Sequence, residues 1–305
     1  ALGSDSGFLS LTLTHDNGNE SFSANLPVEA NRTRGLSLRG PDGTGHSTGL
    51  GLVSEEAIAW LLIENLGNAA EQQIAISWDG TSWGSDLRIF DSDGIEISAL
   101  SLGPGEIIEV TVRLPVPAGA APGDSVETPL SMCVGAGEEE ACSSVELEFI
   151  ASRTAIMPSH IRTVPENGLE WEVFADLGEG EEVVNWSLSE AGMVMQGWSW
   201  SGSGGLNVSG DVVSLAGTPG SRASGILNLD MPEDARPSFH LFEDTGENGS
   251  NSPLSLSVEV LQIHRAGLEV NSPTLLPYVV DVDEPSVVVL RLENPGNGDD
   301  SYHLS

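Results

Sequence analysis

Residues 100–124 read LSLGPGEIIEVTVRLPVPAGAAPGD, and this stretch decides the fold. Apolar residues occupy alternate positions from Ile108 to Leu114, and polar or charged residues occupy the positions between them. A period of two is typical of a β-strand with one buried face and one face in water. Gly103-Pro104-Gly105 predicts a turn before the strand. Pro115 and Pro117 predict its end, because proline cannot donate a hydrogen bond to a sheet.

Similar segments recur along the chain. VSEEAIAWLLIENLGN (53–68) aligns without a gap with VDEPSVVVLRLENPGN (282–297), and each combines an acidic turn, an apolar strand and the motif Glu-Asn-x-Gly-Asn. A weaker copy, GEGEEVVNWSLSEAG (178–192), aligns Trp186 with Trp60. The Pro-Gly turn with its alternating strand recurs at 215–232. The repeat is about 115 residues long, a typical length for a β-sandwich domain.

The repeat decides between helix and strand for residues 54–68. Alone, this segment is compatible with an amphipathic helix that begins at Ser54, with acidic residues in its first turn. Its counterpart is rich in valine and has a proline directly after Asn294, which favours a strand. Homologous repeats share one structure, so we expect strands at both places and little or no helix anywhere.

The repeat also predicts the domain boundaries. Complete modules are expected at 34–152 and 153–263. Residues 1–33 are expected to be the closing strands of a truncated module, and residues 264–305 the opening strands of another. The sequence is therefore interpreted as a fragment of a longer polypeptide.

Charge excludes several classes of partner. The chain has 46 acidic residues against 11 basic ones, which gives a formal net charge of −35, and every basic residue is arginine. Such a surface repels phosphate backbones and anionic membranes, so we expect no nucleic acid partner. The longest apolar run, residues 57–63, is too short to span a bilayer, so no membrane insertion is expected within the fragment. The 39% of hydrophobic residues is sufficient for packed cores.

The order of these motifs resembles a known family. An apolar strand with Glu-Asn-x-Gly-Asn, then Leu-x-Pro-Gly, an alternating strand and Val-Pro-x-x-Ala-x-Pro-Gly is similar to the CARDB (cell-adhesion-related) and related immunoglobulin-like modules. The resemblance is clear in 34–152, partial in 264–305 and weaker in 153–263, where the motif has become Ser-Glu-Ala-Gly at 189–192. It implies an all-β fold of tandem immunoglobulin-like β-sandwiches, truncated at both ends. It also implies an extracellular structural or adhesive role, because such modules occur in tandem on archaeal and bacterial surface proteins and beside the catalytic domains of some secreted hydrolases.

Candidate catalytic residues are few. Gly45-His46-Ser47-Thr48-Gly49 matches the G-x-S-x-G nucleophile elbow, but that motif needs a buried strand before the serine and a helix after it. A turn-rich segment precedes Ser47 and a strand is expected after it, so we predict no hydrolase site. The six histidines are scattered without metal-ligand spacing. No catalytic residue, no enzymatic activity and no cofactor other than weakly bound calcium is expected.

Two patterns leave a binding role open. Asp91 and Asp93 begin a sequence similar to a calcium loop, although a tight turn explains Asp91-Ser92-Asp93-Gly94 more simply. Acidic segments at 15–20, 135–141 and 243–251 fall at equivalent turns of successive modules and could also attract divalent cations weakly. Trp198 and Trp200 share one face of a predicted strand, where they form either part of the core or a platform on which a sugar stacks.

Cys133 and Cys142 are the two cysteines, and they lie in the two arms of one predicted hairpin. We predict that they form a disulfide, which favours an oxidising compartment; two buried free thiols are the alternative. The function expected from the sequence is a non-catalytic extracellular array, a stalk or spacer of a cell-surface protein. Its expected partners are neighbouring modules of the same chain and a surface glycan or protein. The alternative is a set of accessory, carbohydrate-binding modules of a secreted hydrolase.

Overall fold

The computed structural model describes residues 6–14, 21–137, 140–165, 168–188, 197–244, 253–270 and 290–301. These residues form β-strands and turns, with no α-helix among them, so the all-β prediction is confirmed. The described residues divide into two compact units, which separate inside β13 (Thr154–Met157), and Pro253 also belongs to the first unit. The four-part division expected from the sequence stays a prediction.

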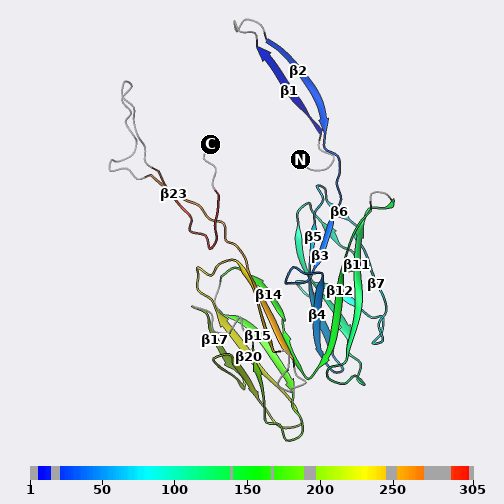
Figure 1. Cartoon of the computed structure of the whole chain (residues 1–305), viewed down its shortest axis with the longest axis vertical. Coiled ribbons are helices and arrows are strands. Elements are labelled where there is room, and N and C mark those ends of the chain that lie inside the picture. Colours follow the sequence, from blue (N-terminus) through cyan, green and yellow to red (C-terminus); the bar gives the residue numbers. More distant parts are fainter. Residues whose placement is uncertain are drawn as a thin grey trace. The chain divides into compact units, whose positions relative to one another are not determined.

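The first unit contains a sandwich of two four-stranded sheets (Figure 1), and these are joined into one eight-stranded sheet by a single residue pair, Leu50 with Ile58. One sheet has the order β3 (Leu36–Arg39), β5 (Glu56–Asn65), β10 (Ile107–Pro115) and β8 (Arg88–Asp91). The other has the order β4 (His46–Leu52), β12 (Ala141–Ser152), β11 (Ser125–Val134) and β7 (Ala75–Trp78). A two-stranded piece, β6 (Glu71–Gln72) with β9 (Ser101–Leu102), lies outside both sheets.

The first strand of this sandwich is divided between the two sheets. Its first half, β3, pairs antiparallel with β5, and its second half, β4, pairs parallel with the last strand, β12. Glycine makes the crossing possible, because a Cβ on Gly51 would lie 2.5 Å from the backbone of Ala57. In immunoglobulin lettering the two sheets are A-B-E-D and A′-G-F-C, so the strand order defines an immunoglobulin-like sandwich.

The strand that decides the fold lies at the centre of its sheet. Val110, Val112 and Leu114 are buried on the core side, as the alternation predicts, whereas Ile108 at the start of β10 is half-buried. Thr111 on the opposite face is also buried, because it lies between Trp60 and Phe90, its partners on the two neighbouring strands.

The second unit repeats most of this strand order. One sheet contains β13, β15 (Leu169–Asp176), β20 (Arg222–Asp230) and β17 (Ser199–Ser203). A second sheet contains β14 (His160–Thr163), β22 (Leu254–Val260) and β21 (Ser238–Asp244), and β14 is parallel to β22 as β4 is to β12. A third, three-stranded sheet contains β16 (Val183–Ser187), β19 (Val212–Ala216) and β18 (Leu206–Ser209). Trp171, Trp186 and Phe242 fill the core.

The strand pairing corrects the alignment of the middle repeat. The alignment predicts that residues 178–192 match β5, with Trp186 in the place of Trp60. In the structure β15 is the counterpart of β5, because β15 pairs with β20 as β5 pairs with β10. Trp186 lies in the next strand, β16, which pairs with β19. The segment 189–192, expected to be the altered motif, lies outside the described residues.

A pair of antiparallel strands lies toward each end of the described chain. β1 (Ser6–Thr14) pairs with β2 (Ser21–Glu29). β23 (Gly267–Val270) pairs with β24 (Leu290–Glu293), and its register repeats that of β3 and β5, since Gly267 lies opposite Glu293 as Ser37 lies opposite Glu64. The C-terminal strand pair is thus equivalent to β3 and β5 of the first sandwich.

Candidate functional sites

The disulfide lies at one end of the first sandwich. Cys133 and Cys142 face one another across the β11–β12 hairpin, with Cα atoms 4.1 Å apart, and their sulfur atoms are bonded as the sequence predicts. The bond joins the arms of a hairpin that is already paired along its length. Its part in the structure is therefore to fasten the end of the hairpin.

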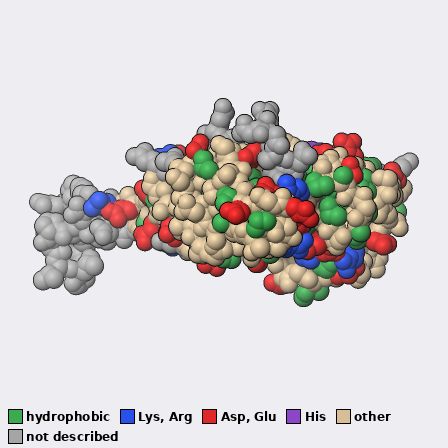
Figure 2. All heavy atoms as spheres, turned by 90° about the horizontal axis from the view of Figure 1, so that it is seen from below, with side chains coloured by type: hydrophobic (Ala, Val, Ile, Leu, Met, Phe, Trp, Pro, Cys, Tyr) green, Lys and Arg blue, Asp and Glu red, His purple; other side chains and the backbone are tan. Residues whose placement is uncertain are grey.

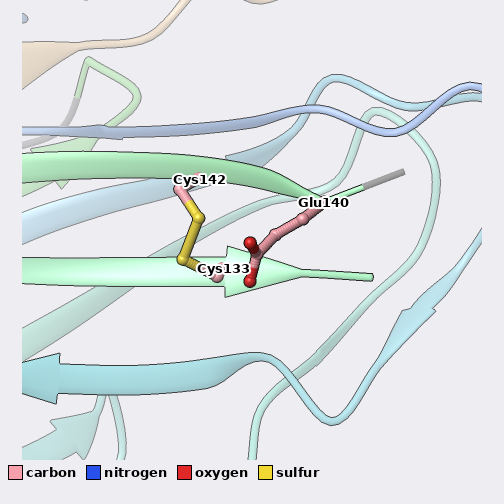
Figure 3. Close-up of side chains that lie close together, drawn as sticks. All are labelled: Cys133, Glu140 and Cys142. Atoms are coloured by element: carbon pink, nitrogen blue, oxygen red, sulfur yellow. A yellow bond between two sulfur atoms is a disulfide. The ribbon is translucent and has the colours of Figure 1, made fainter. Parts of the chain in front are cut away.

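Glu140 is the third member of this group (Figure 3). One carboxylate oxygen of Glu140 and the two sulfur atoms lie within 4.8 Å of one another, a spacing that a metal ion would fit. Thiolates bind metal ions, whereas both sulfur atoms here are consumed in the disulfide. In the oxidised chain these three residues are consequently a structural group.

The two aspartates of the calcium-like sequence form a turn. One oxygen of Asp91, Oδ1, accepts hydrogen bonds from the backbone N–H of Asp93 at 3.0 Å and of Ile95 at 2.8 Å. Gly94 takes a positive φ of 75°, as the turn requires. This arrangement uses Asp91 to close the turn. Calcium binding by Asp91 and Asp93 stays a prediction, and the acidic segments expected to assist it lie wholly or partly outside the described residues.

Ser47 of the G-x-S-x-G sequence is a buried residue with a structural role in the sandwich. It lies within β4, its side chain is buried, and its Oγ donates a hydrogen bond to the carbonyl of Trp60 at 2.7 Å. Gly49 is required by close packing, because a Cβ there would lie 2.9 Å from the backbone of Ala59. Both residues therefore serve the crossing of β4 over β5.

Trp198 and Trp200 belong to an aromatic seam formed by side chains of β15, β17 and β21 and by Trp198, which directly precedes β17. We use this name for Trp171, Trp198, Trp200, His240 and Phe242. The Trp200 ring lies 5.6 Å from Trp171 and 5.1 Å from Phe242, and the Trp198 ring lies 5.1 Å from His240. Both indoles are half-buried against the core of the second unit. Their contacts are those expected of core tryptophans, and the carbohydrate platform stays a prediction.

Two histidines of the second unit are shielded from water. His160 in β14 is 2% exposed, and its Nδ1 lies 2.9 Å from Ser257 Oγ, to which it is hydrogen-bonded. Burial, and secondly the positive charge of Arg162, lowers the pKa of His160 to about 4. Burial also lowers the pKa of His240. Both imidazoles are therefore neutral at pH 7.

The acidic side chains are dispersed. Figure 2 shows them scattered over the face that it draws, with basic side chains beside acidic ones. Arg39 pairs with Glu64 at 2.7 Å, for example, and Arg162 pairs with Glu259 at 3.0 Å. A dispersed charge of this kind is typical of a solvated surface. No helix of the described residues is long and apolar enough to cross a membrane.

Comparison with known proteins gives likenesses of fold. No protein-family model and no curated protein matches the sequence. Among solved structures, the chain is similar to the extracellular cadherin domains 1–4 of protocadherin gamma B7, with 12% identity, a TM-score of 0.29 and coverage of 95% of this chain and 67% of that one. It is also similar to the CARDB domain of a Pyrococcus furiosus protein in complex with di-metal ions, with 15% identity, a TM-score of 0.21 and coverage of 39% and 88%.

A third likeness is to an enzyme. A family 123 glycoside hydrolase from Clostridium perfringens has 9% identity and a TM-score of 0.27, with coverage of 43% of this chain. The chain spans 30% of the length of that hydrolase. All three TM-scores are below 0.5, so the assignment of immunoglobulin-like sandwiches rests on the strand order described above.

Proposed function

We propose that the chain is a segment of a non-catalytic extracellular array, a stalk or spacer built from tandem sandwich modules of the CARDB type. One observation carries the proposal: two sandwiches that share most of their strand order follow one another, and the C-terminal strand pair repeats the register of β3 and β5 in the first. A serial repeat of one structural unit is the construction expected of a spacer.

Three features support this proposal. The residues that could suggest catalysis have structural partners, since Ser47 bonds to a backbone carbonyl and His160 bonds to Ser257. The disulfide favours an oxidising compartment. The strongly acidic composition keeps a long chain soluble and separate from anionic surfaces.

Surface labelling tests the location. Antibodies raised against the 305-residue chain are expected to label intact cells of the source organism as strongly as permeabilised cells. Labelling that appears only after permeabilisation would contradict an extracellular array.

A glycan screen distinguishes the proposed array from the alternative function, accessory modules of a hydrolase. The purified chain is applied to a glycan array, and we expect no specific glycan to be retained. Retention that Trp198→Ala abolishes, while the thermal unfolding curve stays unchanged, would favour the hydrolase accessory role.

A further inference from the structure

Two segments of the described chain lead from one strand pair into the opening strand of the next repeat. The first, residues 30–35, lies between β2 and β3, and the second, residues 261–266, lies between β22 and β23. Neither segment belongs to a strand. Each one nevertheless passes over a Glu-Asn-x-Gly-Asn loop and is hydrogen-bonded to it.

The second asparagine of the first motif holds the first linker. Asn68 Oδ1 accepts a hydrogen bond from the N–H of Thr33 at 2.8 Å, and Asn68 Nδ2 donates to the carbonyl of Asn31 at 2.9 Å. The backbone N–H of Asn68 donates to the carbonyl of Thr33 at 3.2 Å. One residue thus satisfies three polar groups of the linker main chain.

The equivalent asparagine of the last repeat makes the same pair of side-chain bonds. Asn297 Oδ1 accepts from the N–H of Ile263 at 2.5 Å, and Asn297 Nδ2 donates to the carbonyl of Leu261 at 2.9 Å. Asn297 Nδ2 also donates to the carbonyl of Ala235 at 2.9 Å, within the preceding sandwich. Asn297 is buried. The two linkers are therefore held by the same atoms in the same pattern.

A carboxylate three residues further on contacts two linker side chains in each case. Glu71, 1% exposed, pairs through Oε2 with Arg32 at 2.9 Å and Arg34 at 2.7 Å. Asp300 Oδ1 lies 3.2 Å from Gln262 Nε2 and 2.6 Å from His264 Nδ1.

The two linkers place donors at matching positions. In the first linker Arg32 Nη2 also donates to the carbonyl of Ala70, and in the second Gln262 Nε2 donates to that of Asp299. The side chains differ between the linkers, whereas the donor positions are the same.

The glycine of the motif brings the loop close to the linker. A Cβ on Gly67 would lie 2.6 Å from the carbonyl oxygen of Thr33, and a Cβ on Gly296 would lie 2.2 Å from that of Ile263. Real Cβ atoms do not approach this closely, so glycine is needed for the contact itself. Neither glycine takes a positive φ, so no unusual backbone conformation explains it.

We infer that Glu-Asn-x-Gly-Asn-x-x-Glu/Asp is a linker socket, a binding site for the segment that leaves the preceding module. The asparagine binds main-chain N–H and C=O groups of the linker, and these groups are present whatever the linker sequence is. The carboxylate selects linkers with side-chain hydrogen-bond donors one and three residues after the residue whose carbonyl accepts from the asparagine. The inference concerns contacts within the chain, and it holds whether or not the chain is an extracellular array.

The second sandwich provides a natural contrast. The N–H of Leu177 donates to the carbonyl of Ser221 as the N–H of Asn65 donates to that of Glu106, so Leu177 has the place of the first asparagine. No asparagine occurs in the loop that follows, residues 178–182. The socket is therefore a property of particular repeats and is not required for the sandwich itself.

Trypsin tests the inference, because it cleaves after arginine and lysine and the chain has arginine in both linkers but no lysine. The full chain is compared with Asn68→Ala and Asn297→Ala, and the first cleavage products are identified by mass. We expect Asn68→Ala to accelerate cleavage after Arg32 and Arg34 about tenfold or more, and to leave cleavage after Arg265 unchanged. Asn297→Ala is expected to accelerate cleavage after Arg265 and to leave cleavage after Arg32 and Arg34 unchanged.

Two further variants complete the design. Asn31→Ala keeps the linker carbonyl and removes an exposed side chain, so it is expected to be cleaved at the wild-type rate. Asn68→Asp keeps the Oδ1 acceptor and removes the Nδ2 donor. This is a milder change, and it provides the test if Asn68→Ala fails to fold. Equal cleavage of the wild type and of both Asn68 variants at Arg32 and Arg34 would overturn the inference. So would acceleration of cleavage in both linkers by either single variant.

Discussion

Asn65 and Leu177 occupy equivalent positions at the ends of β5 and β15, although one side chain is polar and the other apolar. The backbone N–H of each donates to the strand that enters the same sheet, to Glu106 at 3.1 Å and to Ser221 at 3.0 Å. Asn65 is fully buried, whereas Leu177 belongs to the apolar core of the second unit. The equivalent strand ends of the two sandwiches are thus held by a polar side chain in one unit and by an apolar side chain in the other.

Replacement of Asn65 by alanine should destabilise the first unit. Its Nδ2 donates to the carbonyls of Ala69 and Leu102, and its Oδ1 accepts from the N–H of Gly67, so alanine leaves three polar groups without these partners. We expect a loss of about 3 kcal/mol in the free energy of unfolding, measured by denaturant titration. Asn294→Ala is the matched control, because Asn294 has the same position in its motif but is exposed, and its loss should be clearly smaller. Equal losses would contradict the role given to burial.

Gly67→Ala should disturb the linker contact while leaving the loop backbone unstrained. The new methyl group would lie 2.6 Å from the carbonyl oxygen of Thr33, so the linker has to move away. We expect the free energy of unfolding, measured by thermal denaturation, to fall by about 1–3 kcal/mol. Tryptic cleavage after Arg34 should also become faster. A Cβ on Gly80 would meet no atom within 4 Å, so Gly80→Ala should change stability by less than about 0.5 kcal/mol. Similar effects of the two substitutions would show that the close approach has no energetic consequence.

His160 should make the stability of the second unit depend on pH. Its pKa is about 4 in the folded chain and about 6.5 in an unfolded one, so between these values the unfolded state binds the proton and the folded state does not. The free energy of unfolding should therefore fall by about 3 kcal/mol as the pH falls from 7 to 4. His160→Gln keeps a group that can bond to Ser257 and removes the titration. A difference between wild type and variant that is the same at pH 7 and pH 4 would refute this role for His160.

The disulfide should stabilise the first unit through its closed loop. Cys133 and Cys142 are nine positions apart, and a loop of that size gives about 2–3 kcal/mol by restricting the unfolded chain. The double variant Cys133→Ala/Cys142→Ala should lose this amount in denaturant unfolding, and reductant should then have no further effect. Wild-type chain that unfolds at the same denaturant concentration with and without reductant would show that the bond adds nothing.

The sequence predicts the sandwich because the evidence for it is local. The alternation in β10, the turns that flank it and the two cysteines of one hairpin each depend on neighbouring residues. The position of the middle repeat could not be predicted in this way. Residues 183–187 and β5 are both apolar segments with a tryptophan, and the pairing of β15 with β20 is what identifies the counterpart of β5.

The role of the repeated motif also depends on contacts that sequence alone does not show. Glu-Asn-x-Gly-Asn is recognisable as a turn, whereas the partners of its second asparagine lie more than thirty positions earlier in the chain, in segments without regular structure. Nothing in the sequence distinguishes Glu71 as a contact residue, because it is one of 46 acidic residues. Arginine at alternate positions directly before a module, as in Arg32 and Arg34, was the available hint.

Amide hydrogen exchange of the wild-type chain at Thr33 and Ile263 tests the linker socket most directly. Both residues lie outside strands, and their N–H groups donate to Asn68 and Asn297. We expect both amides to exchange about a hundredfold more slowly than in an unstructured peptide, and Asn68→Ala to remove the protection of Thr33 while leaving that of Ile263 unchanged. Exchange of both amides at the rate of an unstructured peptide would contradict the account.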